Sequence, residues 1–246
     1  MKKSNHHVLI DWGNTACKVA FAKCKEIETI VRNGDGESPE AFIKKILNDE
    51  LFDVIAFSSV QQYDRELVSW LASRCHKLVV VDGDTPTALR IDYQTTDRLG
   101  ADLLAGGLGA VTRFPGEDIV VMDLGTAITV ESINKEGWLV GVNISPGLQA
   151  RFTALHQSTH ALPLIKLSEG EDIPDYGIDT WGAMAAGVVL GIIHEIEGYI
   201  VKNQGKRIIL TGGDAIFFAK KLKTPIFVDC NLIFSGLIEI ADSYAE

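Results

Sequence analysis

One pattern constrains the fold more than any other: an apolar strand that ends in aspartate and runs into a glycine turn, found twice. The first copy lies at residues 11–15, after the apolar run 8–10, and the second lies at 123–127, after the apolar run 119–122. The two aspartates are 112 positions apart, and each turn leads into another segment with the alternating pattern of a strand. Repetition of a whole unit is typical of internal duplication, so the sequence predicts two similar halves.

Strands alternate with helices between the two turns. Strand-like runs at 54–58 and 77–81 enclose a helix-like run at 64–74. Another helix is predicted to begin with Ser38 as its N-cap and Pro39 at its first position, where the fixed φ and the missing donor of proline fit. Such alternation is typical of an α/β sheet protein.

The second half continues the alternation. We expect a strand at 138–144, a long apolar-faced helix at 180–201, a strand at 207–210 and a last helix at 232–244. The segment 101–112, rich in Ala, Leu and Gly, predicts a connecting helix that packs closely on a neighbour. That neighbour is either another helix of the same chain or a helix of a second copy.

The size of the chain allows two domains. With 246 residues, of which 46% are hydrophobic, the chain can bury one large core or two cores of about 120 residues each. No linker rich in Pro and Ser separates the halves. We therefore expect an N-terminal domain at 1–115 and a C-terminal domain at 116–246, packed around a cleft.

Charge and cysteine usage exclude several classes of protein. The net charge of -10 disfavours nucleic acid or an anionic membrane as a partner. We expect no signal peptide, because a strand-like run follows the basic start at once, and no membrane span, because no run reaches about 18 apolar residues. The 4 cysteines have no C-x-x-C spacing, so neither a zinc site nor a disulfide framework is predicted. The expected location is the cytoplasm.

The two turns have the chemistry of a phosphate site. Glycine lets backbone N–H groups come close to a phosphate, and an aspartate at the strand end can hold Mg²⁺ directly or through water. An Asp-x-Gly turn is also a common hairpin element, but two of them, one in each half, favour a clamp for a polyphosphate. The side chains placed to assist are Thr15, Thr126 or Thr129, and Lys18.

A third glycine turn, at 211–214, follows the predicted strand 207–210 and opens a helix. Helix starts of this kind suit anions, although a plain tight turn is the other interpretation. The chain lacks the G-x-x-x-x-G-K-[ST] loop, and it lacks G-x-G-x-x-G after its first strand. The sequence therefore indicates a nucleotide site of neither the P-loop nor the Rossmann kind.

Seven short motifs follow one another in order along nearly the whole chain. They are 10–15, 58–60, Tyr93 with 100–102, 123–127, 144–147, 179–180 and 211–213. In this order they resemble the type III pantothenate kinases, which belong to the superfamily of acetate and sugar kinases, heat-shock chaperones and actin. The resemblance implies an α/β fold of two duplicated ribonuclease-H-like domains with a nucleotide cleft between them.

The resemblance also implies an activity and its cofactors. The reaction is the ATP-dependent phosphorylation of pantothenate to 4'-phosphopantothenate, the first step of coenzyme A biosynthesis, with Mg²⁺ and a monovalent cation, K⁺ or NH₄⁺. Asp102 is the implied catalytic base, which takes the proton from the pantothenate hydroxyl. The other interpretation of Asp102 is a cap for the helix that follows it. The implied assembly is a homodimer.

Binding roles follow from the same resemblance. ATP and its metal are assigned to Asp11, Gly13, Asn14, Thr15, Lys18, Gly125, Thr126, Gly212 and Gly213. Pantothenate is assigned to Tyr93, Gly100, Ala101, Thr180 and His156. Asp11 is assigned to the metal ion that accompanies ATP, and Asp123 to the monovalent cation. For His156, a side chain that is merely packed or solvated is the alternative.

The position after Asp102 departs from the family pattern. The family has Arg directly after its catalytic Asp, where it contacts substrate, and this chain has Leu103. The substitution leaves two alternatives open beside the pantothenate kinase. One is a nucleotide-binding regulatory protein of the same fold that has lost catalysis, and the other is a kinase for a different small metabolite.

Overall fold

The computed structural model of this chain describes residues 6–92, 94, 99–167 and 171–245. Within it the chain forms two compact units. The first unit contains Met1–Glu117, Ile133–Val140 and Asn231–Glu246, and the second contains Asp118–Ser132 and Gly141–Cys230. The division of the sequence into duplicated domains at 1–115 and 116–246 remains a prediction.

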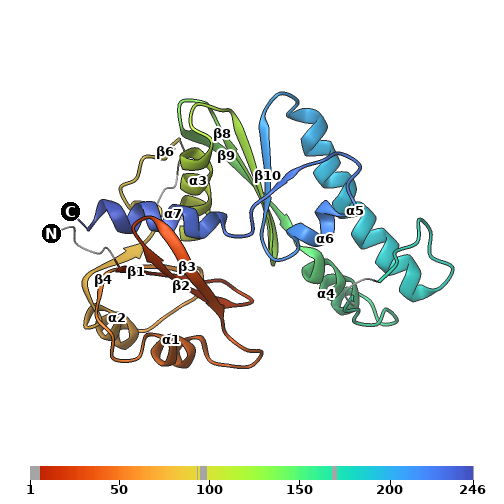
Figure 1. The fold of residues 1–246 in the computed structure, drawn as a ribbon. Helices are drawn as coiled ribbons and strands as arrows, with labels where there is room; N and C mark the ends of the chain where they lie inside the picture. Colours follow the sequence, from red (N-terminus) through yellow and green to blue (C-terminus); the bar gives the residue numbers. More distant parts are fainter. Residues whose placement is uncertain (1–5, 93, 95–98, 168–170, 246) are drawn as a thin grey trace. The chain divides into compact units, whose positions relative to one another are not determined.

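The first unit is built on a five-stranded sheet with the strand order β3-β2-β1-β4-β5 (Figure 1). Its strands are β1 (His6–Trp12), β2 (Cys17–Lys23), β3 (Glu26–Arg32), β4 (Phe52–Ser59) and β5 (Cys75–Val81). β1, β2 and β3 form an antiparallel meander, and β4 and β5 run parallel to β1. Parallel neighbours require crossover connections, which α1 (Pro39–Leu47) and α2 (Arg65–Ala72) supply.

The two faces of this sheet carry different side chains, because successive residues of a strand point to opposite faces. On one face, Val8 and Ile10 of β1 join a buried cluster with Phe42 of α1 and Leu67 of α2. The other face carries His7, Leu9 and Asp11 and meets α7 (Leu232–Ser243), as Figure 1 shows. Asp11 therefore lies on the face opposite the main core of the first unit.

The helices α3 (Ala101–Arg113) and α7 pack very closely, although they come from distant parts of the sequence. A Cβ added at Gly236 would lie 1.9 Å from the carbonyl oxygen of Ala105, and one added at Gly109 would lie 2.2 Å from that of Leu232. The predicted close packing of segment 101–112 is confirmed, and its neighbour is a helix of the same chain.

The second sheet repeats the strand order of the first. It reads β11-β10-β7-β8-β9-β6. Its strands are β6 (Arg90–Ile91), β7 (Ile119–Leu124), β8 (Ala127–Ile133), β9 (Trp138–Pro146), β10 (Arg207–Thr211) and β11 (Phe227–Val228). β7 has its hairpin partner β8 on one side and the parallel strands β10 and β11 on the other, as β1 has β2 on one side and β4 and β5 on the other. The duplication predicted from the two turns is confirmed in the topology.

The second unit is completed by three helices: α4 (Leu148–Ser158), α5 (Thr180–Lys202) and α6 (Ala215–Ala219). Apolar residues of α5 such as Val189 and Ile192 form one core with Met122 and Leu124 of β7. By length and composition α5 is the one helix of the described chain that could cross a membrane, but core helices of soluble proteins pass the same test.

Most predicted elements are confirmed within one or two residues at their ends, including the helix capped by Ser38, whose hydroxyl accepts from the N–H of Ala41. The two-residue strand β6 was not predicted, and β11 covers only the last two residues of the strand-like segment 225–228. A strand of two residues is too short to show the alternation of apolar and polar residues that predicts a strand.

Candidate functional site

The first turn, residues 11–15, is a tight connection between β1 and β2. The N–H of Gly13 donates to the carbonyl of Ala16 at 2.9 Å, and Asp11 is opposite Lys18 in the antiparallel register. Asn14 and Thr15 are exposed at the tip. The turn thus presents polar side chains and a short backbone at the carboxyl end of a central strand.

The end of β4 supports this turn. The N–H of Val60 donates to the carbonyl of Trp12 at 3.1 Å, and the side-chain amide of Gln61 donates to Asn14 Oδ1 at 2.8 Å. The mid-domain motif at 58–60 therefore lies beside the first turn. Gln61 was not predicted as a site residue, because its partner lies 47 positions away in the sequence and no local pattern marks the pair.

Asp102 lies in the first turn of α3, whose N-cap is Gly100. Its Oδ1 accepts a hydrogen bond from the N–H of Leu103 at 2.9 Å. A Cβ at Gly100 would lie 2.3 Å from this same Oδ1, so a larger residue there would displace the carboxylate of Asp102. The interpretation of Asp102 as a helix cap is correct in part, since the carboxylate binds one backbone donor of the first turn, but the N-cap position itself belongs to Gly100.

Asp11 and Asp102 form an electrostatically strained pair in the first unit. Burial raises the pKa of Asp11 to about 6, an effect that Lys18 reduces and the charge of Asp102 increases. The pKa of Asp102 is also raised, because burial outweighs the backbone N–H groups of Leu103 and Asp102. Among the described residues, Lys18 is the cationic side chain that lowers the pKa of Asp11, so an added cation beside the two desolvated carboxylates would be stabilised.

The second turn, residues 123–127, has different surroundings. A Cβ at Gly212, which has a φ of +92°, would lie 2.4 Å from Asp123 Oδ1, and one at Gly147 would lie 2.1 Å from the carbonyl oxygen of Gly125. The N–H of Gly147 donates to the carbonyl of Thr126 at 3.0 Å, and the N–H of Asp214 donates to that of Leu124 at 2.9 Å. Two glycines, Gly125 and Gly212, therefore lie against the carboxylate of Asp123.

The structure thus brings the motifs at 123–127, 144–147 and 211–213 together in the second unit. The register between β7 and β10 places Thr211 directly beside Asp123. Burial raises the pKa of Asp214. Gly213, which follows Gly212 in this group, is exposed with open space around it.

The residues assigned to pantothenate are divided between the two units. Gly100 and Ala101 lie with Asp102 at the start of α3, and Tyr93 lies outside the described residues. Thr180 opens α5, next to its N-cap Asp179. His156 is exposed on α4, and its Nδ1 lies 2.7 Å from the carbonyl oxygen of Leu162.

Thr180 also lines a cavity of about 810 Å³ between α4 and α5. The lining is mostly apolar and consists of Pro146, Arg151, Ala154, Leu155, Ser158, Leu162, Thr180, Ala183, Met184, Gly187 and Val188. Arg151 Nε donates to the carbonyl of Pro146 at 2.8 Å, and its guanidinium forms an ion pair with Glu195. Ser145 Oγ donates to the other oxygen of Glu195 at 2.6 Å.

The carboxylates near the turns fit a magnesium ion that also binds phosphate. Among the described residues there is no group of three His, Cys, Asp or Glu side chains that could hold a metal without other ligands. Mg²⁺ commonly uses one or two carboxylates together with waters and substrate phosphates. Asp11, desolvated and repelled by Asp102, suits such a site.

Comparison with known proteins identifies close relatives. The family model described as type III pantothenate kinase matches residues 7–202. The type III pantothenate kinase of Porphyromonas gingivalis strain W83 is 38% identical over 241 residues, which cover 96% of this chain and 98% of that protein.

Solved structures share the fold at lower identity. A putative Baf family transcriptional activator from Campylobacter jejuni has a TM-score of 0.62 at 22% identity and covers 96% of this chain and 98% of its own. The activator of 2-hydroxyisocaproyl-CoA dehydratase from Clostridium difficile, solved with bound ADPNP, has a TM-score of 0.56 at 13% identity, with 98% of this chain and 94% of that chain covered. At these identities the likeness shows the fold alone.

Proposed function

We propose roles for individual residues in the reaction of this chain, which belongs to the type III pantothenate kinase family and phosphorylates pantothenate in the first step of coenzyme A biosynthesis. The chain is a kinase, and its phosphate donor is ATP. The observation that supports the assignments best is the pair Asp11 and Asp102 in the first unit, because phosphoryl transfer needs one carboxylate for a metal and one for the attacking hydroxyl.

The first turn binds the phosphates of ATP. Asp11 holds Mg²⁺ together with phosphate oxygens and water, Lys18 neutralises charge beside it, and Gly13, Asn14 and Thr15 offer backbone and side-chain donors at the tip. The magnesium ion neutralises the negative charge of the phosphates. This role explains why a desolvated carboxylate with a raised pKa occurs at the end of β1.

Asp102 is the general base. Its raised pKa makes it a better proton acceptor than an ordinary aspartate, and a base works best when its pKa is near the working pH. The hydrogen bond from the N–H of Leu103 fixes one carboxylate oxygen. The other oxygen is then the one that orients the pantothenate hydroxyl for attack on the γ-phosphorus.

The second turn binds a monovalent cation and contributes to nucleotide binding. Asp123 is the ligand for K⁺ or NH₄⁺, and the glycines beside its Oδ1, Gly125 and Gly212, let backbone groups come close to such a cation. Gly125, Thr126, Gly212 and Gly213 contact the nucleotide. Gly212 is compatible with this role because its positive φ and close approach to Asp123 exclude any other side chain.

Pantothenate is bound by Gly100 and Ala101 beside Asp102, with Tyr93, Thr180 and His156 as further contacts. Leu103 stands where the family has a substrate-contacting arginine. Restoring the charge tests this assignment: Leu103→Arg is expected to lower the KM for pantothenate by about tenfold, the value of one good charge-assisted hydrogen bond. An unchanged KM would mean that an arginine at position 103 does not reach the carboxylate of pantothenate.

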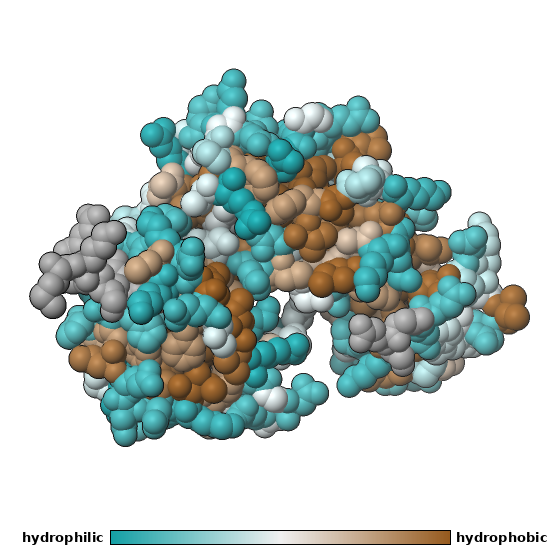
Figure 2. All heavy atoms as spheres, in the orientation of Figure 1, coloured by the Kyte–Doolittle hydropathy of each residue, from teal (hydrophilic) through white to brown (hydrophobic). Residues whose placement is uncertain are grey.

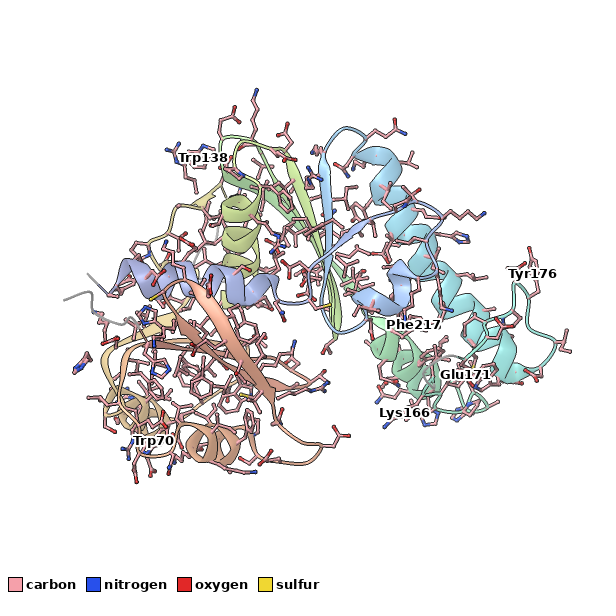
Figure 3. The ribbon with its side chains drawn as sticks, in the orientation of Figure 1. Trp70, Trp138, Lys166, Glu171, Tyr176 and Phe217 are labelled. Atoms are coloured by element: carbon pink, nitrogen blue, oxygen red, sulfur yellow. The ribbon has the colours of Figure 1, made fainter. Side chains whose placement is uncertain are left out.

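The chain acts as a homodimer in the cytoplasm, without a nucleic-acid or membrane partner. Support for the dimer comes from apolar exposure in the second unit. Tyr176 and Ile178 are highly exposed in the loop before α5, and the apolar cavity opens between α4 and α5. Figure 3 shows Tyr176 pointing outward from this loop, and Figure 2 shows apolar atoms protruding at the same end.

A coupled assay for ADP tests the proposed roles. The wild-type chain is expected to form ADP with pantothenate, Mg²⁺ and K⁺, and Asp102→Asn is expected to lower kcat by about 10² to 10⁴ while ATP binding persists. Absence of ADP formation in the wild-type chain with intact nucleotide binding would instead favour the regulatory alternative. Full activity of Asp102→Asn would remove Asp102 from its role as base.

A further inference from the structure

Ser58, near the end of β4, is fully buried, and its hydroxyl has no hydrogen-bond partner among the described residues. An unpaired buried hydroxyl costs free energy, and alanine at this position would avoid the cost. Such a group calls for a role that the unliganded protein does not show.

The strand register places Ser58 beside the first turn. Ser58 is paired with Asp11 in the parallel register of β1 and β4, and Asp11 is paired with Lys18 in the antiparallel register of β1 and β2. Side chains of directly paired residues share a face of the sheet. Lys18, Asp11 and Ser58 therefore form one polar row across the sheet.

The next row along the same face is apolar. It consists of Ala20, Leu9 and Ala56, each two positions along its strand from a member of the polar row; they are paired with one another and are fully buried. The hydroxyl of Ser58 thus lies in the row where the side chains on this face change from apolar to polar. A purely structural small residue would need no hydroxyl at this point.

The second half of the molecule repeats the arrangement. Asp123 on β7 is paired with Thr211 on the parallel strand β10, as Asp11 on β1 is paired with Ser58 on the parallel strand β4. Thr211 is buried as well. A buried hydroxyl residue beside the aspartate, in the same register, is thus a shared feature of the two duplicated units.

We propose that Ser58 is a positioning residue for Asp11: when magnesium and ATP occupy the first turn, its hydroxyl donates to the Asp11 carboxylate, directly or through one water, and fixes which carboxylate oxygen faces the cation. Thr211 has the corresponding place beside Asp123. This inference rests on the proposed function of the first turn.

The test compares Ser58→Ala with the wild-type full-length chain. Because the variant loses an unpaired group, its melting temperature without ligand should be equal or higher. Its affinity for a non-hydrolysable ATP analogue with Mg²⁺, measured by calorimetry, should fall by about tenfold, since a hydrogen bond to a charged group is lost. The Mg²⁺ concentration for half-maximal activity should rise in parallel.

A matched control is Thr85→Val, which deletes a buried hydroxyl in the same unit that does have partners. Thr85 Oγ1 donates to Asp82 Oδ1 at 3.0 Å and accepts from the N–H of Asp82 at 2.9 Å. This variant should lose thermal stability and keep its Mg²⁺ dependence. The opposite pattern in Ser58→Ala, with stability kept and Mg²⁺ dependence changed, distinguishes positioning from packing.

A double-mutant cycle with Asp11→Asn identifies the partner of the hydroxyl. If Ser58 acts through Asp11, Ser58→Ala should have no further effect on analogue affinity in the Asp11→Asn background. Equal losses in both backgrounds, or an unchanged affinity in Ser58→Ala alone, would overturn the inference. A wild-type chain that fails to bind the Mg²⁺–analogue complex would instead refute the proposed function of the first turn.

Discussion

The first and second turns share a strand topology and differ in what surrounds their aspartates. Asp11 has two charged neighbours that shift its pKa, Lys18 and Asp102, whereas Asp123 has two glycines, Gly125 and Gly212, against its Oδ1. Duplication has kept the backbone frame, because the strand order and the Asp–hydroxyl register recur. The neighbours of the two aspartates have diverged, and the proposed function assigns phosphate and Mg²⁺ to the first turn and a monovalent cation to the second.

The largest effect is expected from adding a methyl group at Gly147, which packs against the backbone of the second turn. In Gly147→Ala the new Cβ would lie 2.1 Å from the carbonyl oxygen of Gly125 and 2.6 Å from that of Thr126, and backbone atoms cannot easily move away. We expect a loss of about 4 kcal/mol in the free energy of unfolding, measured by urea denaturation. The matched variant is Gly13→Ala in the first turn, whose nearest atom would be 3.4 Å away, and it should lose less than about 1 kcal/mol. Similar losses in both variants would mean that the turns are packed alike.

Asp11→Asn should stabilise the unliganded protein at neutral pH. Burial raises the pKa of Asp11 to about 6 from 3.8, so the ionised carboxylate opposes folding above pH 6, and this cost disappears below about pH 4. At 1.36 kcal/mol per pH unit, the gain at pH 7.5 is at most about 3 kcal/mol.

The pH dependence provides the check on Asp11→Asn. The stability difference between variant and wild type should shrink as the pH falls from 6 to 4, because the wild-type carboxylate then becomes protonated in the folded state. Chemical denaturation at three pH values measures this difference. A destabilised variant at pH 7.5 would show that the carboxylate makes favourable contacts in the unliganded first turn.

Cation titrations can test the proposal that Asp11 binds Mg²⁺ and Asp123 binds the monovalent cation. If Asp123 holds the monovalent cation, Asp123→Asn should raise the K⁺ concentration for half-maximal activity by about tenfold, about 1.4 kcal/mol, and leave the Mg²⁺ dependence nearly unchanged. Asp11→Asn should do the reverse. The measurement is the ADP-forming rate across K⁺ and Mg²⁺ titrations in both variants. A shared loss of both cation dependences would mean that the two aspartates serve one site.

Local sequence signals were sufficient for the elements that carry the two turns. The segments 8–22 and 119–133 show strand periodicity on both sides of a glycine turn, and each folds as two adjacent strands. Ser38 with Pro39 marked the start of α1 in the same way, because capping depends only on neighbours in the chain.

What the sequence could not predict depends on contacts between distant residues. The partner of α3 is α7, and Gly236 touches Ala105 across 131 positions. Ser58 and Thr211 acquire their places only through the register of parallel strands whose crossovers vary in length. The ion pair of Arg151 with Glu195 links two helices and has no local pattern.

The smallest effects are expected from side chains that form hydrogen bonds or ion pairs next to each turn. In the second unit, Glu195 binds Arg151 and Ser145, next to the loop whose Gly147 donates to Thr126. These ions are about three-quarters buried, so Glu195→Gln should cost about 1 to 2 kcal/mol of unfolding free energy, because Arg151 loses its charged partner.

The first turn is instead held by a solvent-exposed hydrogen bond, from the side-chain amide of Gln61 to Asn14. Gln61→Ala should cost less than about 0.5 kcal/mol, because water replaces the lost partner at the surface. Denaturation of both variants in low and in high salt provides the comparison. Salt should weaken the effect of Glu195→Gln and leave that of Gln61→Ala unchanged, since only the former removes an ion pair. Equal costs would indicate that the second turn owes its shape to glycine packing alone.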